Sequence, residues 1–331
     1  MILGPEELAA KVGERTERWP LAFWYWGDAI AVDGLLAVAA AGFPRGRDHV
    51  TALLERWLGT IPVGYHDALA PGATIARLVG EGALPEAALQ RFLDAEASLP
   101  LLYDEVPALE PHLPRFRFGV CIDAVYHLPP ALAAAGRARG NDALVSRAVR
   151  MAGQIMARLR CDGGWAQWYD AARGRNNGVP WSRGVGWAAL GILDTLTLAE
   201  GVAETAHLKS LAAELLQRLV DTQDQGGHWG PVLGREDLPA ESSVAAFFLA
   251  SALHPEAANL AVPRGSIEAA TTAVRESLDD EGVCQGVSAD VFPDWDPTTY
   301  ERFSTEPSPW GQGAALRALA ALAGARPTPS A

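Results

Sequence analysis

The sequence predicts an all-α protein, and three observations support this prediction. Hydrophobic residues make up 49% of the 331 residues and charged residues 20%, as in ordinary soluble globular proteins. Alanine and leucine, which are strong helix formers, dominate the composition, whereas runs of β-branched residues are scarce. Apolar residues recur at spacings of three and four, which is the period of an amphipathic helix.

This spacing predicts twelve helical segments, whose ends are marked by turn residues such as Gly59, Gly82, Gly140 and Gly201 and by Pro263 before the eleventh segment. The expected spans are 5–18, 28–42, 48–58, 67–81, 85–97, 122–137, 141–160, 183–200, 204–222, 241–254, 264–279 and 310–324. No linker divides the chain, so we expect a single domain over residues 1–325. The Pro-rich residues 326–331 are expected to form a frayed tail.

Twelve helices arranged as hairpins can stack into a solenoid or close into an (α/α)6 toroid. Short segments rich in tryptophan and glycine recur between the helices. They are Trp24-Tyr-Trp-Gly-Asp28, Asp162-Gly-Gly-Trp165, Trp181 to Trp187, Gly226-Gly-His-Trp-Gly230 and Trp310-Gly-Gln-Gly313. At one end of a toroid such loops would form a deep aromatic pocket, whereas a solenoid would spread them along a face. The recurrence favours the toroid, although the sequence does not show ring closure directly.

The charge and the terminal segments exclude several functional classes. A net charge of −13 and a pI near 5.0 argue against nucleic acid or an anionic membrane surface as a partner. No apolar run is long enough to span a membrane, and the N-terminus lacks the features of a signal peptide, so we expect a cytoplasmic protein. The cysteines form no disulfide or zinc pattern, and no phosphate loop or dinucleotide fingerprint is present. We expect no cofactor and no metal.

The stretch Trp181-Ser-Arg-Gly-Val-Gly-Trp187 is the most informative feature of the chain. Indole faces stack on sugar rings, and a guanidinium binds a carboxylate through two parallel hydrogen bonds. Glycines allow the backbone to approach a ligand closely. The segment therefore suggests a site for an acidic sugar. The alternative interpretation is a tight turn with tryptophans in the core.

Five landmarks from about Trp24 to Leu322 resemble, in order, those of the unsaturated uronyl hydrolases of glycoside hydrolase families 88 and 105. The rhamnogalacturonyl type of family 105 is the more similar. The landmarks are His66-Asp-Ala-Leu-Ala-Pro-Gly72; Phe118-Gly-Val-Cys-Ile-Asp-Ala-Val-Tyr-His-Leu-Pro129; Gly163 to Asp170 followed by Trp181 to Trp187; Gln223 to Trp229 with Glu241-Ser-Ser-Val-Ala-Ala246; and Gly311-Gln-Gly-Ala314.

The resemblance implies an (α/α)6 barrel and a particular reaction. Such an enzyme removes a terminal uronic acid with a C4=C5 double bond from a short oligosaccharide made by a polysaccharide lyase. It hydrates an enol ether, so the carboxylate spacing rule of ordinary glycosidases does not apply. The implied partner is a small unsaturated oligosaccharide, and the chain is expected to be a monomer or a homodimer.

Two aspartates match the catalytic positions of the family. Asp123 matches the residue that serves as acid and then as base, and its apolar context is expected to raise its pKa. Asp67 matches a second aspartate, expected to hydrogen-bond sugar hydroxyls or orient the water. For both residues, the alternative is an N-cap aspartate at the start of a helix.

The resemblance also implies substrate-binding residues. Arg183 is the candidate for recognition of the uronate charge, with Trp181 and Trp187 packing on the sugar. The alternative is a structural arginine stacked between tryptophans. Gln167 stands where the family often has a histidine, and we expect it to contact substrate.

Further candidates lie in the preceding loops. His112 lies eleven residues before Asp123, where several family members carry a histidine, although a surface loop histidine is an equal alternative. Tyr25 and Trp26 stand, with Trp24 beside them, where the family places a pocket-lining aromatic residue. His127 follows Asp123 by one helical turn and is a candidate modulator of its pKa.

Three departures from the family pattern concern specificity. Besides Gln167, Leu113 follows His112 where a basic residue is usual, and Ala289-Asp290 replaces the usual Gly-Thr. Because of these departures, the identity of the leaving sugar stays open, including whether it is rhamnose. Alternative functions are another (α/α)6 enzyme such as an epimerase or inverting glycosidase, a catalytically inactive carbohydrate-binding toroid, and a helical scaffold for protein partners.

Overall fold

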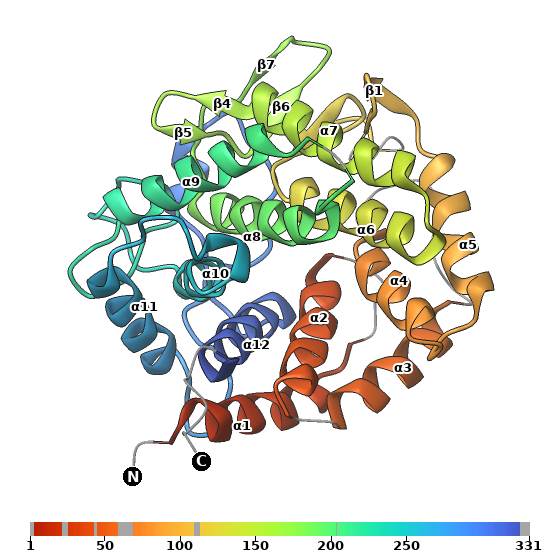
Figure 1. Cartoon of the computed structure of the whole chain (residues 1–331). Helices are drawn as coiled ribbons and strands as arrows, with labels where there is room; N and C mark the ends of the chain where they lie inside the picture. The colour runs from red at the N-terminus through yellow and green to blue at the C-terminus, as the bar shows by residue number, and fades with distance from the viewer. Residues whose placement is uncertain are drawn as a thin grey trace.

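The computed structural model describes residues 3–21, 26–42, 45–58, 69–108, 113–202 and 204–324. Helices alternate along these ranges between an inner and an outer position (Figure 1). The inner helices are α2 (Trp26–Ala40), α4 (Gly72–Gly80), α6 (Ala124–Arg139), α8 (Ser182–Ala199), α10 (Ser242–Ala252) and α12 (Pro309–Gly324). The outer helices are α1 (Pro5–Glu17), α3 (Arg45–Trp57), α5 (Glu86–Ala97), α7 (Asp142–Leu159), α9 (Ala206–Asp221) and α11 (Arg264–Glu276).

The inner helices form a closed ring. Each packs against the next inner helix, and α12 packs against α2, so the two ends of the series meet (Figure 1). This is an (α/α)6 toroid, and it confirms the predicted fold class. Each expected helical span overlaps one observed helix.

The distribution of apolar residues explains which helices are inside. In α10, every side chain from Ser243 to Ala252 is buried, as expected for a helix enclosed by protein. In α7, burial is confined to one face, which carries Val145, Val149 and Ala152 at helical spacing. A helix of this type covers the ring on one side and meets solvent on the other.

Local sequence signals set the helix ends. The turn between α6 and α7 uses Gly140 in the left-handed region, with φ of 60°, and the side chain of Asn141 accepts hydrogen bonds from the N–H groups of Ala143 and Leu144. The start of α4 was predicted at residue 67 but lies at Gly72. Pro71 has no N–H group to donate and stands at the N-cap position, so the helix begins after it.

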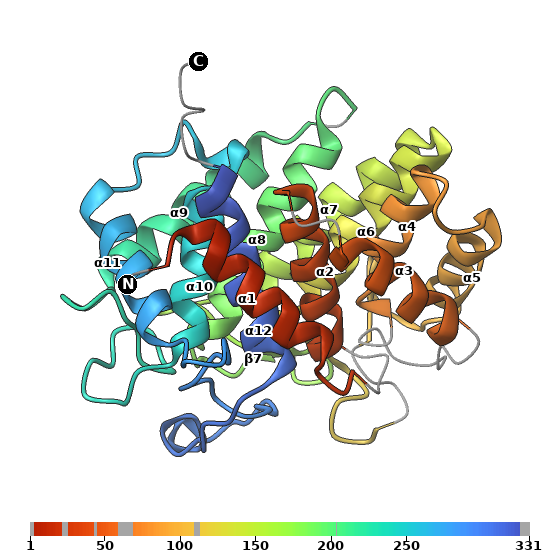
Figure 2. The same ribbon diagram turned by 90° about the horizontal axis from the view of Figure 1, so that it is seen from below.

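The connections on the two rims of the ring differ in length. Those that lead into the inner helices are long and lie together on one side (Figure 2). They contain short strands that the apolar spacing did not predict: β1 (Leu101–Tyr103), β2 (Val106–Pro107), β3 (Gly119–Cys121), β4 (Arg160–Cys161), β5 (Gly164–Trp165), β6 (Trp168–Asp170) and β7 (Arg175–Asn176). β3, β6 and β7 form an antiparallel sheet in which Val120 lies opposite Tyr169.

The closing contact between α2 and α12 is unusually close. A Cβ atom on Gly313 would lie 2.3 Å from the carbonyl carbon and oxygen of Ile30, and one on Gly34 would lie 2.8 Å from the carbonyl oxygen of Gly313. Glycine is therefore required on both helices where the ring closes. In the described part of the chain, no helix combines the length and apolar character needed to cross a membrane. The single domain ending at residue 325 stays a prediction.

Candidate active site

The N-termini of the inner helices point to one rim, because each inner helix is followed by an outer helix that returns the chain. The long loops lie on this rim (Figure 2). Asp123 immediately precedes α6, Arg183 lies in the first turn of α8, and Glu241 immediately precedes α10. The fold thus brings together residues that are far apart in the sequence.

Asp123 is held at the rim by a strand on one side and a helix on the other. β3 ends at Cys121, and the N–H of Ile122 donates to the carbonyl oxygen of Gln167 at 2.9 Å. α6 begins at Ala124, and the Asp123 carbonyl oxygen accepts the N–H of Tyr126 at 2.9 Å. Asp123 occupies the N-cap position of α6, but its half-buried side chain makes no capping hydrogen bond.

Arg183 is completely shielded from solvent and anchors the loop ahead of α12. Its Nη1 donates to the carbonyl oxygen of Ser288 at 2.6 Å and to the Ser288 hydroxyl at 3.0 Å, and its Nη2 donates to the carbonyl oxygen of Ala289 at 3.0 Å. Burial lowers the pKa of Arg183, while the negative charges of Glu241, Asp123 and Asp290 oppose this shift. The guanidinium therefore supplies positive potential close to Asp123.

Glu241 is a buried residue at the rim that the sequence analysis did not select as a candidate. Its Oε1 lies 3.6 Å from Nη1 of Arg183, and it accepts hydrogen bonds from the Ser288 N–H at 3.0 Å and from the Ser243 hydroxyl. The sequence offered one signal for Glu241, because this charged residue stands directly before an apolar helical segment. In the structure it is buried beside the cation of Arg183.

The tryptophans of the rim pack on Arg183 and on one another. The Arg183 guanidinium carbon lies 4.7 Å from the Trp181 ring centroid, 5.7 Å from that of Trp310 and 6.0 Å from that of Trp26. Trp181 and Trp187 are 1% and 0% exposed, so both indoles face protein. This packing is the arrangement expected of a structural arginine between aromatic rings, and sugar stacking by Trp181 and Trp187 stays a prediction.

Four buried N–H groups at this rim lack an acceptor within the described ranges. They belong to Trp165 Nε1, Trp181 Nε1, Trp187 Nε1 and Arg183 Nε. Unsatisfied buried donors are rare in folded proteins and call for a specific explanation. Two of them, on Trp181 and on Arg183 itself, belong to the stacked pair whose guanidinium interacts with the charge of Asp123.

Gln167 is buried and ties three loops together. Its Nε2 donates to the carbonyl oxygen of Val291 at 2.9 Å, its Oε1 accepts the hydroxyl of Tyr300, and its backbone N–H donates to the carbonyl oxygen of Val179 at 2.9 Å. Contact of Gln167 with substrate stays a prediction. His127 is buried too, with its ring centroid 5.2 Å from that of Trp187.

Asp67, His112 and Tyr25 lie outside the described residues, as does Trp24. Among the described residues, no group of three or more histidines, cysteines, aspartates or glutamates is placed to hold a metal ion. The roles predicted for Asp67, His112 and Tyr25 rest on the family resemblance.

Comparisons with known proteins identify the class of this molecule. The whole fold is similar to that of a possible member of the GH105 family from Klebsiella pneumoniae, with a TM-score of 0.83, 18% identity and coverage of 98% of this chain and 94% of the other. It is also similar to an unsaturated glucuronyl hydrolase from Bacillus sp. GL1, with a TM-score of 0.69, 17% identity and coverage of 94% of each chain. The comparisons therefore show the same (α/α)6 toroid fold.

The family follows from the sequence comparison. Residues 118–323 match the model of Glycosyl Hydrolase Family 88, and the chain belongs to this family. Protein Atu3128 of Agrobacterium fabrum is 31% identical over 156 residues, which cover 43% of this chain. The match spans 66% of that protein, so the chain covers just under two thirds of the length of this curated relative.

Proposed function

We propose that the protein removes a terminal 4,5-unsaturated uronic acid from lyase-generated oligosaccharides by hydrating the enol ether double bond. Membership of the family supports this activity. The observation that carries it is the position of Asp123, whose carboxyl group is not used as a helix cap and lies within the field of the buried Arg183. The favoured form is the rhamnogalacturonyl type, with the identity of the leaving sugar left open.

In this proposal, Asp123 acts first as an acid. It gives a proton to C4, and the electron pair of the C4=C5 bond forms the new C–H bond. Positive charge then develops at C5 and on the ring oxygen. The resulting Asp123 carboxylate is stabilised by the positive potential of Arg183 and by the N-terminal end of α6.

Asp123 then acts as a base. A water molecule adds to C5 and returns a proton to the carboxylate, so one residue completes both transfers. The product is a hemiketal at C5 that opens, and the opened sugar releases the leaving saccharide from C1. The role proposed for Asp67 is to orient this water or the sugar hydroxyls.

The test is the loss of the ultraviolet absorbance of the conjugated enol, using unsaturated disaccharides made by several lyases. Asp123→Asn is compared with wild type and with Asp142→Asn, an exposed aspartate in the first turn of α7 at the opposite rim. We expect Asp123→Asn to lower the rate by about 10²-fold or more and Asp142→Asn to leave it unchanged. Equal rates for wild type and Asp123→Asn would remove Asp123 from the mechanism. No absorbance loss with any disaccharide would reject the activity.

A further inference from the structure

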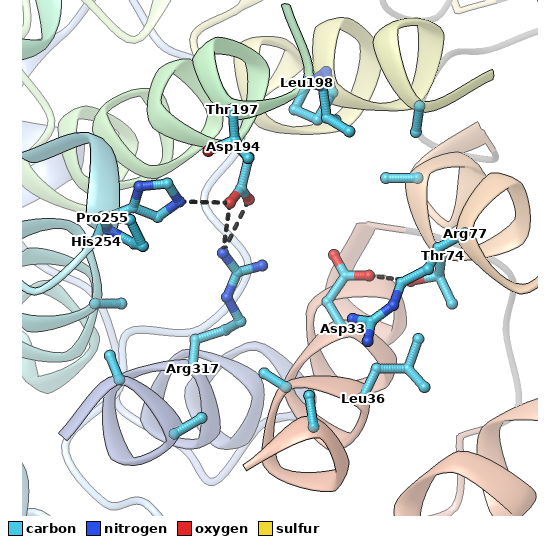
Figure 3. Close-up of a pocket in the computed structure, with 18 of the residues that line it drawn as sticks. Asp33, Leu36, Thr74, Arg77, Asp194, Thr197, Leu198, His254, Pro255 and Arg317 are labelled. Atoms are coloured by element: carbon cyan, nitrogen blue, oxygen red, sulfur yellow. Dashed lines mark hydrogen bonds and ion pairs between the residues drawn. The ribbon is translucent and has the colours of Figure 1, made fainter. Parts of the chain in front are cut away.

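We propose that the end of the ring opposite the candidate active site holds a second binding site, which takes a neutral, hydroxyl-rich small molecule such as a sugar or polyol. A cavity of about 1050 Å³ lies there. All six inner helices line it, most of them with their C-terminal portions, so it lies on the axis of the ring (Figure 3). The volume is that of a site for a small organic ligand.

A layer of aromatic side chains separates this cavity from the rim of Asp123. Trp187 packs on Tyr126 and Phe247 with ring centroids 4.7 Å and 4.5 Å apart, and Trp26 packs on Trp310 at 4.7 Å. Tyr126 contributes to both sides, because its ring contacts Trp187 while it also lines the cavity. The two ends of the ring are therefore chemically distinct compartments.

A seven-residue interval places polar groups beyond the aromatic layer. In three pairs, the polar residue lies two helical turns, or about 10 Å, beyond the aromatic residue on the same helix face, and in the fourth it lies just past the end of α10. The pairs are Trp26 and Asp33, Trp187 and Asp194, Phe247 and His254, and Trp310 and Arg317. Four segments of the ring thus present a charged or titratable side chain to one cavity.

These polar groups form two linked clusters. Asp194 accepts hydrogen bonds from Nη2 of Arg317 at 2.8 and 2.9 Å and lies 3.3 Å from Nε2 of His254 (Figure 3). Asp33 accepts the hydroxyl of Tyr126 at 2.8 Å and that of Thr74. Burial raises the pKa of Asp33, whereas Arg317 opposes the shift.

A purely structural role for these polar side chains does not account for the cavity. Protein interiors are close-packed, and a buried ion pair adds little stability relative to apolar side chains of similar volume. Here the charged groups instead border a large space, and alanine is the most frequent of the other residues that line it. That combination, an apolar wall with a few convergent polar groups, is typical of a ligand site.

The charges favour a neutral ligand. Asp33 and Asp194 disfavour an anion, while Arg317 lies between them and disfavours a cation (Figure 3). At the mouth, Arg77 pairs with Glu81, and Arg137 caps α8 by donating to the carbonyl oxygens of its last turn. Both arginines at the mouth are therefore already engaged, Arg77 with a carboxylate and Arg137 with backbone carbonyl oxygens.

The donors and acceptors of the cavity that remain for a ligand are suited to hydroxyl groups. Among the described residues, Arg317 donates only through Nη2, which leaves N–H groups on Nε and Nη1 for a ligand. The carboxylates of Asp33 and Asp194 can accept further hydrogen bonds. A hydroxyl group both donates and accepts, so adjacent hydroxyls satisfy this mixed set, and the alanine walls fit the C–H face of a sugar ring.

The test measures binding without catalysis, so that it does not depend on the proposed function. Saturation-transfer NMR and calorimetry on Asp123→Asn protein would use galactose, rhamnose and maltose as neutral probes, galacturonate as an anion and glucosamine as a cation. We expect the neutral sugars to bind with a Kd of about 0.1–10 mM. Ala37→Phe, which fills the cavity from α2, should weaken this binding at least tenfold, whereas the exposed Ala87→Phe on α5 should not.

Four outcomes would overturn the proposal. They are unchanged binding in a folded Ala37→Phe protein, stronger binding of galacturonate or glucosamine than of neutral sugars, no binding of any neutral sugar, and displacement of the neutral sugar by an unsaturated disaccharide. The displacement experiment uses Asp123→Asn protein alone, so it remains decisive if Ala37→Phe does not fold. Binding that survives the disaccharide and is lost in Ala37→Phe would establish the second site.

Discussion

Arg183 and Glu241 meet at the start of two neighbouring inner helices, with Nη1 and Oε1 3.6 Å apart and both side chains almost fully shielded from solvent. Both also bind Ser288, Arg183 through its carbonyl and hydroxyl oxygens and Glu241 through its N–H and hydroxyl groups. The pair therefore fixes the loop ahead of α12 to α8 and α10. This loop carries Asp290, whose charge acts on Arg183.

Glu241→Gln is expected to destabilise the protein by about 3–5 kcal/mol, because it keeps the shape of the side chain but leaves Arg183 as a buried charge without a carboxylate in contact. Urea unfolding at neutral pH measures this loss. Glu214→Gln is the control, since Glu214 forms an exposed pair with Arg160. Its loss should cost less than about 1 kcal/mol. Similar small costs for both variants would contradict the anchoring role of Glu241.

Gly313→Ala is expected to lower the free energy of unfolding by about 1–3 kcal/mol, because the added methyl group would overlap the backbone of Ile30 and force α12 away from α2. Thermal unfolding monitored by circular dichroism measures the change. Gly324→Ala, at the end of the same helix, is the matched control, since its Cβ atom would meet nothing within 4 Å. Equal unfolding temperatures for the two variants would show that the ring closes without this close contact.

The pH dependence of stability should report the cluster around Asp194. Burial favours a raised pKa, but Arg317 and His254 outweigh it and lower the pKa of Asp194 from 3.8 to about 2. A lowered pKa means that the contribution is present above about pH 4 and is lost as the pH falls through 2. This amounts to about 2 kcal/mol for a shift of this size.

Urea midpoints measured between pH 5 and pH 2 test this expectation. The midpoint of wild type should fall over this range by more than that of Asp194→Asn, which has no carboxyl group to titrate at this position. Parallel curves for the two proteins would show that the ion pair with Arg317 contributes no pH-dependent stability.

Tyr300→Phe is expected to cost about 1–3 kcal/mol, because the hydroxyl of Tyr300 donates to Gln167 and accepts from Asn177 Nδ2 and the Asp294 N–H. Chemical denaturation measures the cost. Tyr103→Phe provides the comparison, because the buried Tyr103 hydroxyl has no hydrogen-bond partner within the described ranges. Its removal should be neutral or stabilising, and a larger loss there than at Tyr300 would count against the loop network.

Local sequence signals predicted much of the fold. Apolar spacing gave the helices, and Gly140 with Asn141 marked the turn between α6 and α7. The short strand pairing of β3 with β6 was not predictable from that spacing, because two or three residues are too few to show a period of two. The start of α4 was misplaced because Pro71 was not weighed as a helix start.

The candidate site was only partly predictable. The motif around Asp123 indicated where the candidate site lies. The partners of Arg183, however, come from the distant loop at Ser288 and Ala289, and no local pattern predicts a contact between residues more than one hundred positions apart. The seven-residue interval between Trp187 and Asp194 was visible in the sequence. Its consequence could not be predicted, because only the closed ring places the polar residues of separate segments around one axial cavity.

The contact between Gly34 and Gly313 also sets the order in which a newly made chain can mature. The ribosome adds about 5–20 residues per second, so roughly 15–55 s separate the emergence of the two glycines. Throughout that interval, the surface of α2 that later shares a core cluster with Leu316 and Leu319 is uncovered. The growing polypeptide therefore carries an uncovered apolar surface on α2 until its own α12 is made. An exposed surface of this kind would allow two nascent chains to exchange α12.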